Sequence, residues 1–192
     1  MTIRCVMCGR SAAGKSSLLY ALRHGTARHF VSDTTIGVAH LRYRNMDVWD
    51  TAGQEQYRAL LGLYFRNAHA TMVVFDITDQ VSFEETSYWA AEVRKYSPDT
   101  RLLLVGAKAD LARQRVISED MCTERAAALG AQYWETSAWT GAGVSEPFRF
   151  LLQDLAPSPT SSLETVSLES DISETYYGGT CCGGGGLLRF GG

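Results

Sequence analysis

The chain has 192 residues, of which 45% are hydrophobic and 20% are charged, and its net charge is −3. This length suits one α/β domain with a sizeable core and leaves little room for a second. Because the net charge is negative and the basic residues are scattered, the sequence excludes a nucleic-acid-binding groove. No apolar run approaches the roughly 18 residues of a membrane-spanning helix, so we expect a cytoplasmic protein.

Residues 1–155 alternate short apolar runs with longer helical patterns. In chain order, the predicted strands are residues 2–8, 38–43, 46–49, 71–75, 102–107 and 131–135. The predicted helices are residues 16–24, 81–96, 118–129 and 144–155. Only Arg44 and Asn45 separate the second and third strands, which predicts a hairpin. The pattern predicts an α/β fold with a six-stranded, mostly parallel sheet, one antiparallel strand, helices on both faces, and ligands at the carboxyl ends of the strands.

The first predicted strand contains Cys5 and Cys8, which form a C-x-x-C pair. Such a pair is typical of redox or metal sites, but five cysteines in a chain without a secretion signal favour reduced thiols. Both cysteines lie in an apolar run, where small hydrophobic side chains fit a buried strand. We therefore favour a core role for this pair.

A glycine loop follows this strand. Residues 9–16, GRSAAGKS, match G-x-x-x-x-G-K-[ST] between a predicted strand and a predicted helix, a context that disfavours an incidental glycine turn. Backbone N–H groups would cradle the α- and β-phosphates of a nucleotide, Lys15 would reach the β/γ oxygens, and the Ser16 hydroxyl would bind Mg²⁺. The predicted nucleotide contacts of this segment are Ser11, Ala12, Ala13, Gly14, Lys15, Ser16 and Ser17.

The sequence WDTAGQE follows at residues 49–55. Asp50 is predicted to hold Mg²⁺ through a water molecule, Gly53 to offer a backbone N–H to a γ-phosphate, and Gln54 to orient an attacking water. Thr35 lies upstream of the hairpin and supplies a further hydroxyl for the metal. The predicted catalytic residues are Lys15, Gly53 and Gln54, and the predicted metal ligands are Ser16, Thr35 and Asp50.

Together these motifs resemble a known family. They are GRSAAGKSS, TIG, WDTAGQE, FDITD at residues 75–79, GAKADL at 106–111 and ETSA at 135–138, in the order and approximate spacing of Ras-superfamily GTPases. WDTAGQE-x-Y-R with a later YFR resembles the Rab branch, and Ala12, FDITD and KADLA resemble its early-endosomal members. The resemblance covers residues 1–155 and implies a P-loop GTPase fold.

The resemblance also implies a function. Relatives bind GTP or GDP with Mg²⁺ and hydrolyse GTP slowly, and two switch segments, here about residues 26–38 and 51–66, order around GTP. Exchange factors, GTPase-activating proteins and effectors would bind these segments. The implied protein is a monomeric Rab-like regulator of vesicle trafficking, located in the cytoplasm or on the cytosolic face of endosomal or other vesicle membranes.

The base-recognition motifs depart from the family pattern. The family's N-K-x-D reads Ala107, Lys108, Ala109 and Asp110 here, so the asparagine is missing. The Asp110 carboxylate can still accept two hydrogen bonds from guanine. The family's SAK reads Ser137, Ala138 and Trp139, and its base-contacting aromatic falls on Ala27, with Phe30 close by. Trp139 or Phe30 would cover the base, or Trp139 would instead pack on the last helix.

An aromatic trio is the implied effector surface. Trp49 and Tyr64 are present, while His40 stands where phenylalanine is usual. Only 15 positions separate Thr35 from Asp50, fewer than the family usually has. Exposed aromatic patches are typical partner sites, although His40 fits equally well as an ordinary strand residue.

Residues 156–192 differ in composition from the rest of the chain. They are rich in Ser, Thr and Glu and then in Gly, which cannot bury enough apolar surface to offset the ordering entropy, so we expect a disordered tail after a GTPase domain of residues 1–155. Cys181 and Cys182 resemble Rab prenylation sites. Ten residues follow the pair, which leaves an unmodified tail as the alternative.

Two functions of different classes remain open on the sequence. Lys15, Ser16, Thr35, Asp50 and Gln54 favour a GTPase that acts as a switch. Ala107, Trp139 and the short hairpin favour a degenerate Rab-like scaffold that binds nucleotide loosely and hydrolyses little or none. A P-loop kinase is a more distant alternative, because no acceptor-binding lid is evident.

Overall fold

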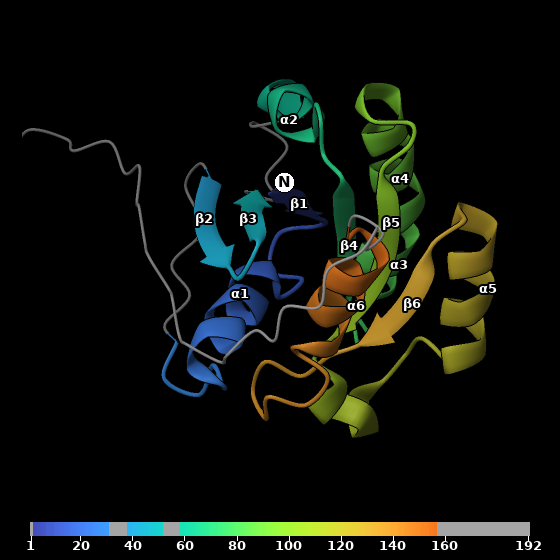
Figure 1. Cartoon of the computed structure of the whole chain (residues 1–192). Helices are drawn as coiled ribbons and strands as arrows, with labels where there is room; N and C mark the ends of the chain where they lie inside the picture. Colours follow the sequence, from blue (N-terminus) through green and yellow to red (C-terminus); the bar gives the residue numbers. More distant parts are fainter. Residues whose placement is uncertain (1, 31–37, 52–57, 157–192) are drawn as a thin grey trace, which may run out of the picture.

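A computed structural model describes residues 2–30, 38–51 and 58–156 (Figure 1). The strands are β1 (Ile3–Cys8), β2 (Val38–Tyr43), β3 (Met46–Thr51), β4 (Ala70–Asp76), β5 (Arg101–Ala107) and β6 (Gln132–Glu135). The helices are α1 (Lys15–His24), α2 (Arg58–Phe65), α3 (Gln80–Glu84), α4 (Thr86–Tyr96), α5 (Glu119–Leu129) and α6 (Glu146–Asp154), with a 3₁₀ helix η2 (Ala109–Gln114).

The six strands form one sheet in the order β2-β3-β1-β4-β5-β6. Neighbouring strands are parallel except β2, which pairs antiparallel with β3. This topology confirms the predicted fold class. In the sheet, β1 lies between β3 and β4, so the strand order reverses direction at β1. Ligands of open α/β sheets bind at such a switch point, here at the carboxyl end of β1.

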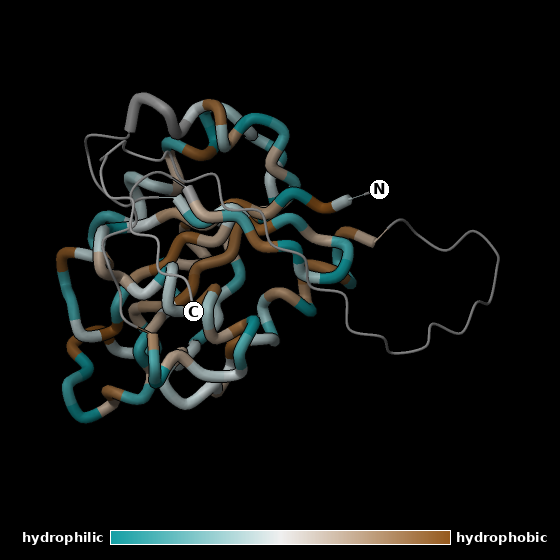
Figure 2. Tube along the Cα trace, turned by 90° about the vertical axis from the view of Figure 1, so that its left-hand side faces the viewer, coloured by the Kyte–Doolittle hydropathy of each residue, from teal (hydrophilic) through white to brown (hydrophobic). Residues whose placement is uncertain are grey.

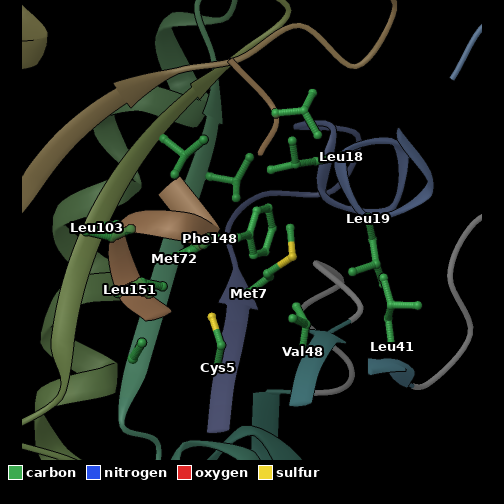
Figure 3. Close-up of a cluster of buried hydrophobic side chains, with 14 of the residues drawn as sticks. Cys5, Met7, Leu18, Leu19, Leu41, Val48, Met72, Leu103, Phe148 and Leu151 are labelled. Atoms are coloured by element: carbon green, nitrogen blue, oxygen red, sulfur yellow. The ribbon is translucent and has the colours of Figure 1, made fainter. Parts of the chain in front are cut away.

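The first core layer lies between the sheet and helices α1 and α6 (Figure 3). Alternate residues of β1, including Cys5 and Met7, point into this layer. Leu18 from α1 and Phe148 from α6 cover them and are almost fully buried. The period of two along the strand therefore places half of an apolar run on this face.

The second core layer covers the opposite face. Val6 and Cys8 of β1 point into it, where they meet Phe65 of α2, Trp89 of α4 and Cys122 of α5. Helices on both faces were predicted, and the two layers confirm them. The apolar segments accordingly run through the middle of the molecule in Figure 2, with hydrophilic segments outside.

The two cysteines of the C-x-x-C pair are buried on opposite faces of the sheet. Burial raises the pKa of both thiols, with the neighbouring Cys8 adding to the effect on Cys5. Side chains three positions apart in a strand point in opposite directions, so the pair cannot converge on a metal or on one another. The core role of Cys5 and Cys8 is confirmed.

The helices differ from the prediction in two places. Residues 81–96 are helical as predicted, but the segment divides into α3 and α4 at Glu85. At this break the Phe83 carbonyl accepts hydrogen bonds from Thr86 Oγ1 at 2.6 Å and from Arg125 Nη1 at 3.2 Å. Such side-chain bonds to the backbone compete with the regular helical pattern.

Helix α2 was not predicted at all. It contains Gly62, which disfavours a helix by about 1 kcal/mol relative to alanine. A Cβ atom at this position would lie 2.7 Å from Tyr96 Cε1 of α4, so the glycine allows the two helices to approach closely. Tertiary packing therefore decides this element. None of the described helices is long and apolar enough to cross a membrane.

Candidate functional site

The loop between β1 and α1 has a backbone that only glycine can adopt at its first position. Gly9 has a φ of +138°, and a Cβ atom there would lie 2.1 Å from the Val74 carbonyl oxygen. Gly14 has a φ of +108° and directly precedes α1, whose amino terminus has no side-chain cap among the described residues. Uncapped N–H groups at a helix start, beside a glycine loop, form an anion-binding arrangement. Ser11 and Ala12 are exposed within the loop and Ala13 is buried.

Lys15 spans the inside of this loop. Its Nζ donates hydrogen bonds to the carbonyl oxygens of Gly9 at 2.9 Å and Arg10 at 2.8 Å. Burial lowers the pKa of Lys15, and the nearby Asp50 carboxylate partly opposes this. The loop therefore holds one ammonium group close to the uncapped helix start.

Ser16 and Asp50 meet beside the loop. Ser16 Oγ donates to Asp50 Oδ2 at 2.5 Å, and Asp50 Oδ1 is buried without a hydrogen-bond partner among the described residues. Burial raises the pKa of Asp50, while the Ser16 hydrogen bond and the Lys15 charge lower it. A buried carboxylate oxygen without a partner is unfavourable unless a cation or another donor meets it.

These two residues fit a magnesium ion. Mg²⁺ prefers oxygen ligands and is usually held by one or two carboxylates together with phosphate oxygens and water. No cluster of three His, Cys, Asp or Glu side chains occurs among the described residues. A site built from Asp50, the Ser16 hydroxyl and a bound phosphate would match this coordination, whereas Thr35, the third predicted ligand, lies outside the described residues.

A cavity of about 440 Å³ adjoins the loop, which is within the usual range for small-molecule sites. It brings together four segments of the chain: the loop with α1, the residues after α1, the end of β5 with η2, and the loop after β6. The lining residues are Gly14, Ser17, Leu18, Ala27, Phe30, Ala107, Lys108, Asp110, Leu111, Thr136, Ala138 and Trp139.

Asp110 is oriented by a neighbour from another segment. Ser137 Oγ donates to Asp110 Oδ1 at 2.6 Å and also accepts from the Thr140 backbone N–H at 3.1 Å. Lys108 is fixed as well, because its Nζ pairs with Asp76 Oδ2 at 2.6 Å. Ser137 is thus placed to position a carboxylate rather than to line the cavity itself.

The two unusual residues of the base-recognition motifs both line the cavity. Ala107 is 4% exposed, and a Cβ atom added to Gly14 would lie 3.2 Å from the Ala107 Cβ. Ala107 therefore lies beside Gly14 of the glycine loop in the cavity wall. Trp139 is 54% exposed, and its carbonyl accepts a hydrogen bond from Arg28 Nε at 3.3 Å.

The segment after α1 closes another side of the cavity. The Ala27 N–H donates to the Ala138 carbonyl at 2.7 Å, which ties this segment to the loop after β6. The Phe30 ring lies 4.8 Å from the Tyr20 ring, measured between centroids. Both Ala27 and Phe30 reach the cavity, so the candidate aromatic is available here together with Trp139.

Sequence reasoning missed several contributors. Leu18, Leu111 and Thr136 line the cavity but were not named as contacts, although Leu111 and Thr136 lie within GAKADL and ETSA. Arg10 of the glycine loop pairs with Glu85 at 2.7 Å and lies 3.8 Å from Asp79, which connects the loop to the start of α3 and its junction with α4. Asp79 ends the FDITD motif and Glu85 follows it, but sequence alone does not show which basic residue meets these two carboxylates.

The predicted aromatic trio comes together. The His40 and Trp49 rings are 4.6 Å apart, and the Trp49 and Tyr64 rings are 6.2 Å apart, between centroids. All three are partly buried, and the Arg4 guanidinium lies 5.1 Å from the Trp49 ring. His40 Nε2 is also 3.2 Å from Asp47 Oδ1. The three side chains therefore form one continuous surface across the hairpin and α2.

The remaining predicted residues lie outside the described part of the chain. They are Thr35, Gly53, Gln54, Cys181 and Cys182. The proposed roles of these five residues rest on the sequence.

A strand, a glycine loop of sequence G-x-x-x-x-G-K-S and a helix, here β1, residues 9–16 and α1, define the class of P-loop proteins. The sequence model of the Ras family matches residues 4–156. The chain is 33% identical to Ras-related protein RABA6a of Arabidopsis thaliana, covering 98% of this chain and 83% of that protein. It is 30% identical to RabC of Dictyostelium discoideum (92% and 95% covered) and 29% identical to Rab-26 of Bos taurus (95% and 75% covered).

The chain therefore belongs to the Ras family of small GTPases, in its Rab branch. The narrower resemblance to early-endosomal Rabs stays a prediction.

Proposed function

We propose that this protein is a Mg²⁺-dependent switch that binds GTP and GDP, hydrolyses GTP slowly and regulates vesicle trafficking. The observation that carries this proposal is one continuous site. In it, Lys15, Ser16 and the Asp50 oxygen that has no partner in the described part of the chain adjoin a cavity lined by Asp110. Phosphate, metal and base each have a matching group in this arrangement.

We assign the residues at the phosphate end of the site to phosphate binding, metal binding and hydrolysis. Lys15 would exchange its two carbonyl partners for phosphate oxygens, and Ser16 and Asp50 would hold Mg²⁺. When bound, Mg²⁺ neutralises charge on the phosphates during transfer. Gln54 would orient the attacking water, and Gly53 and Thr35 would sense the γ-phosphate.

The other end of the site selects the base. A carboxylate accepts hydrogen bonds and does not donate them, so Asp110 suits the N1–H and N2 amino donors of guanine and is unsuited to adenine. The Ala138 backbone and the Trp139 and Lys108 side chains complete the proposed contacts.

The proposed cellular role follows from family membership. Exchange factors, GTPase-activating proteins and effectors would bind the switch segments and the surface of His40, Trp49 and Tyr64. The protein would act as a monomer in the cytoplasm and on the cytosolic face of vesicle membranes. Lipidation at Cys181 and Cys182, in the tail that begins at residue 156, would attach the protein to the membrane.

The direct test of the proposal is the nucleotide that copurifies with the full-length chain. We expect denaturation and chromatography to release GDP or GTP at close to one molecule per protein. Recovery of adenine nucleotide would contradict the proposed base selection. Recovery of no nucleotide, together with no hydrolysis of added GTP, would favour the scaffold function instead.

Ser16→Asn should weaken Mg²⁺-dependent GTP binding more than GDP binding. The lost hydroxyl is a proposed metal ligand, and the γ-phosphate of GTP adds negative charge that Mg²⁺ would neutralise. Nucleotide affinities measured across a magnesium titration test this expectation. Ser87→Asn on α4, on the opposite face of the sheet, is the matched control. If Ser16→Asn retains GTP and GDP binding equally, relative to the wild type, the metal role is contradicted.

Ala107→Asn should slow spontaneous GDP release several-fold, by about two- to twelvefold. The asparagine side chain would enter the cavity and add one hydrogen bond to the base, and a neutral hydrogen bond contributes about 0.5–1.5 kcal/mol. Release of a fluorescent GDP analogue measures the effect, and Ala112→Asn, an exposed position outside the cavity, is the control. Equal release rates with alanine and asparagine at position 107 would show that another group already supplies the contact.

A further inference from the structure

A second hollow, of about 380 Å³, lies between the β2–β3 turn and α6. The turn is at the amino end of β1, where the Ile3 N–H donates to the Asn45 carbonyl, and therefore at the opposite end of the strand from the glycine loop. The hollow is lined by Tyr43, Arg44, Ser145, Arg149, Leu152 and Gln153.

The hollow has unbalanced positive charge. Arg44 and Arg149 are exposed, and neither has a carboxylate within ion-pair distance among the described residues. The Arg44 guanidinium lies 5.7 Å from the Tyr43 ring, which holds it over the hairpin.

Nearby carboxylates are already engaged elsewhere. Asp47 accepts from Arg42 Nη1 at 2.9 Å, and Asp154 pairs with Arg101 Nε at 3.1 Å. Glu146, at the first turn of α6, accepts from Ser145 Oγ at 3.3 Å. The two arginines of the hollow are therefore available to an outside anion.

The chain itself supplies a matching anionic segment. Gln153 of the hollow is followed by Asp154, the last residue of α6. Beyond it, residues 157–175 include four acidic residues and no lysine or arginine. The acidic residues are Glu164, Glu169, Asp171 and Glu174.

The connection is long enough for this segment to fold back. Glu164 is ten positions beyond Asp154, and an extended chain spans up to roughly 3.3 Å per residue, or about 33 Å. The nine residues of α6 extend only about 13 Å. The acidic segment therefore reaches the whole length of the hollow.

We propose that residues 164–174 dock into this hollow, with their carboxylates against Arg44 and Arg149. Tethering makes the contact intramolecular, with an effective concentration in the millimolar range for a short flexible connection. Exposed ion pairs are individually weak and are screened by salt. The docked state is thus partly populated and sensitive to ionic strength.

The charge count favours the acidic segment over a membrane as the occupant. Surface patches that recognise anionic lipids typically cluster about four to eight basic residues. The hollow presents two arginines, and its other four lining residues are uncharged. Two cations match a short acidic peptide better than a charged bilayer.

The first experiment measures access to the acidic segment in the full-length protein. A glutamate-specific protease is added, and mass spectrometry follows cleavage after Glu164, Glu169 and Glu174. We expect cleavage to be about two- to fivefold faster in Arg44→Gln/Arg149→Gln than in the wild type at about 0.05 M salt, with the difference lost near 0.5 M. Lys95→Gln/Arg113→Gln removes the same charge outside the hollow and should leave the rate unchanged.

Equal cleavage rates in the wild type and in Arg44→Gln/Arg149→Gln would overturn the proposal. A second measurement uses the tail variant Glu164→Gln/Glu169→Gln/Asp171→Asn/Glu174→Gln, which leaves the folded domain untouched. Docking predicts altered NMR shifts of the backbone amides of Arg44 and Arg149 in this variant. Unchanged NMR shifts of these two amides would also overturn the docking proposal.

Vesicles of phosphatidylserine and phosphatidylcholine in equal proportions test the lipid alternative. We expect the wild type and Arg44→Gln/Arg149→Gln to sediment with them to the same extent. If the arginine substitutions reduce vesicle binding while cleavage of the acidic segment stays unchanged, the hollow serves a membrane and the proposal is wrong.

Discussion

Asp110→Asn is expected to convert a guanine-preferring protein into a xanthine-preferring one. The carboxylate is suited to the two donors of guanine, and each such charge-assisted bond contributes about 1.5–3 kcal/mol. Asparagine carries no charge and turns an NH₂ donor toward the N2 amino group, so both charge-assisted bonds are lost and guanine binding should weaken by about 10²- to 10⁴-fold. The asparagine amide instead pairs with the N1–H and the 2-carbonyl of xanthine.

The surroundings of Asp110 make this a clean test. Ser137 Oγ donates to Asp110 Oδ1, and an asparagine oxygen can accept the same bond, so the side chain should keep its orientation. Competition between GDP, XDP and ADP for a fluorescent nucleotide measures the preference. Asp120→Asn on α5, outside the cavity, is the control. An Asp110→Asn protein that still prefers GDP would remove Asp110 from base recognition.

Gln54→Leu is expected to slow GTP hydrolysis by about a hundredfold, the effect of losing the alignment of a reacting group. Leucine is similar in size but cannot hydrogen bond to the attacking water. GTP and GDP affinities should change little, because Lys15, Ser16 and Asp110 are retained. The substitution therefore separates hydrolysis from binding.

Single-turnover hydrolysis of GTP bound to purified protein measures this effect. Gln80→Leu, at the exposed start of α3, should hydrolyse GTP at the wild-type rate. The same rate in Gln54→Leu would show that another residue orients the water. No hydrolysis in the wild type would favour the scaffold function.

The strands could be predicted because this sheet is covered on both faces. All seven residues of β4 are buried, and the four central ones, residues 72–75, form a continuous apolar run that is visible in the sequence. The expected boundaries of β1, β4 and β5 differ from the observed ones by only one residue at either end. The ends of strands are harder to predict, because hydrogen bonding of the terminal residues depends on the neighbouring loops.

The helices were harder to predict where packing overrides local preference. Gly62 argues against α2, and only its close approach to Tyr96 explains the helix. Similarly, the break at Glu85 depends on Arg125, which is distant in sequence and donates to the Phe83 carbonyl. Neither contact leaves a periodic signal in the chain.

The candidate site likewise has parts that local sequence predicts and parts that depend on tertiary packing. The glycine loop and Asp50 could be predicted because their chemistry depends on local spacing and on the end of a strand. The motifs that contain Leu111 and Thr136 were recognised, but the role of these two side chains as cavity walls was not, because it follows from how β5 and β6 pair. The hydrogen bond from Ser137 to Asp110 joins two such walls and was likewise not anticipated.

The four tryptophans of the chain occupy separate surroundings. Trp89 is 1% exposed in one core layer, Trp134 packs near Phe150, Trp49 lies in the aromatic surface, and Trp139 borders the cavity with 54% of its surface exposed. The intrinsic fluorescence of these tryptophans can therefore report on separate parts of the protein. An aqueous quencher such as iodide should quench the exposed Trp139 and leave the buried Trp89 unaffected. Shielding of Trp139 from iodide would then report filling of the cavity in real time, on unlabelled protein.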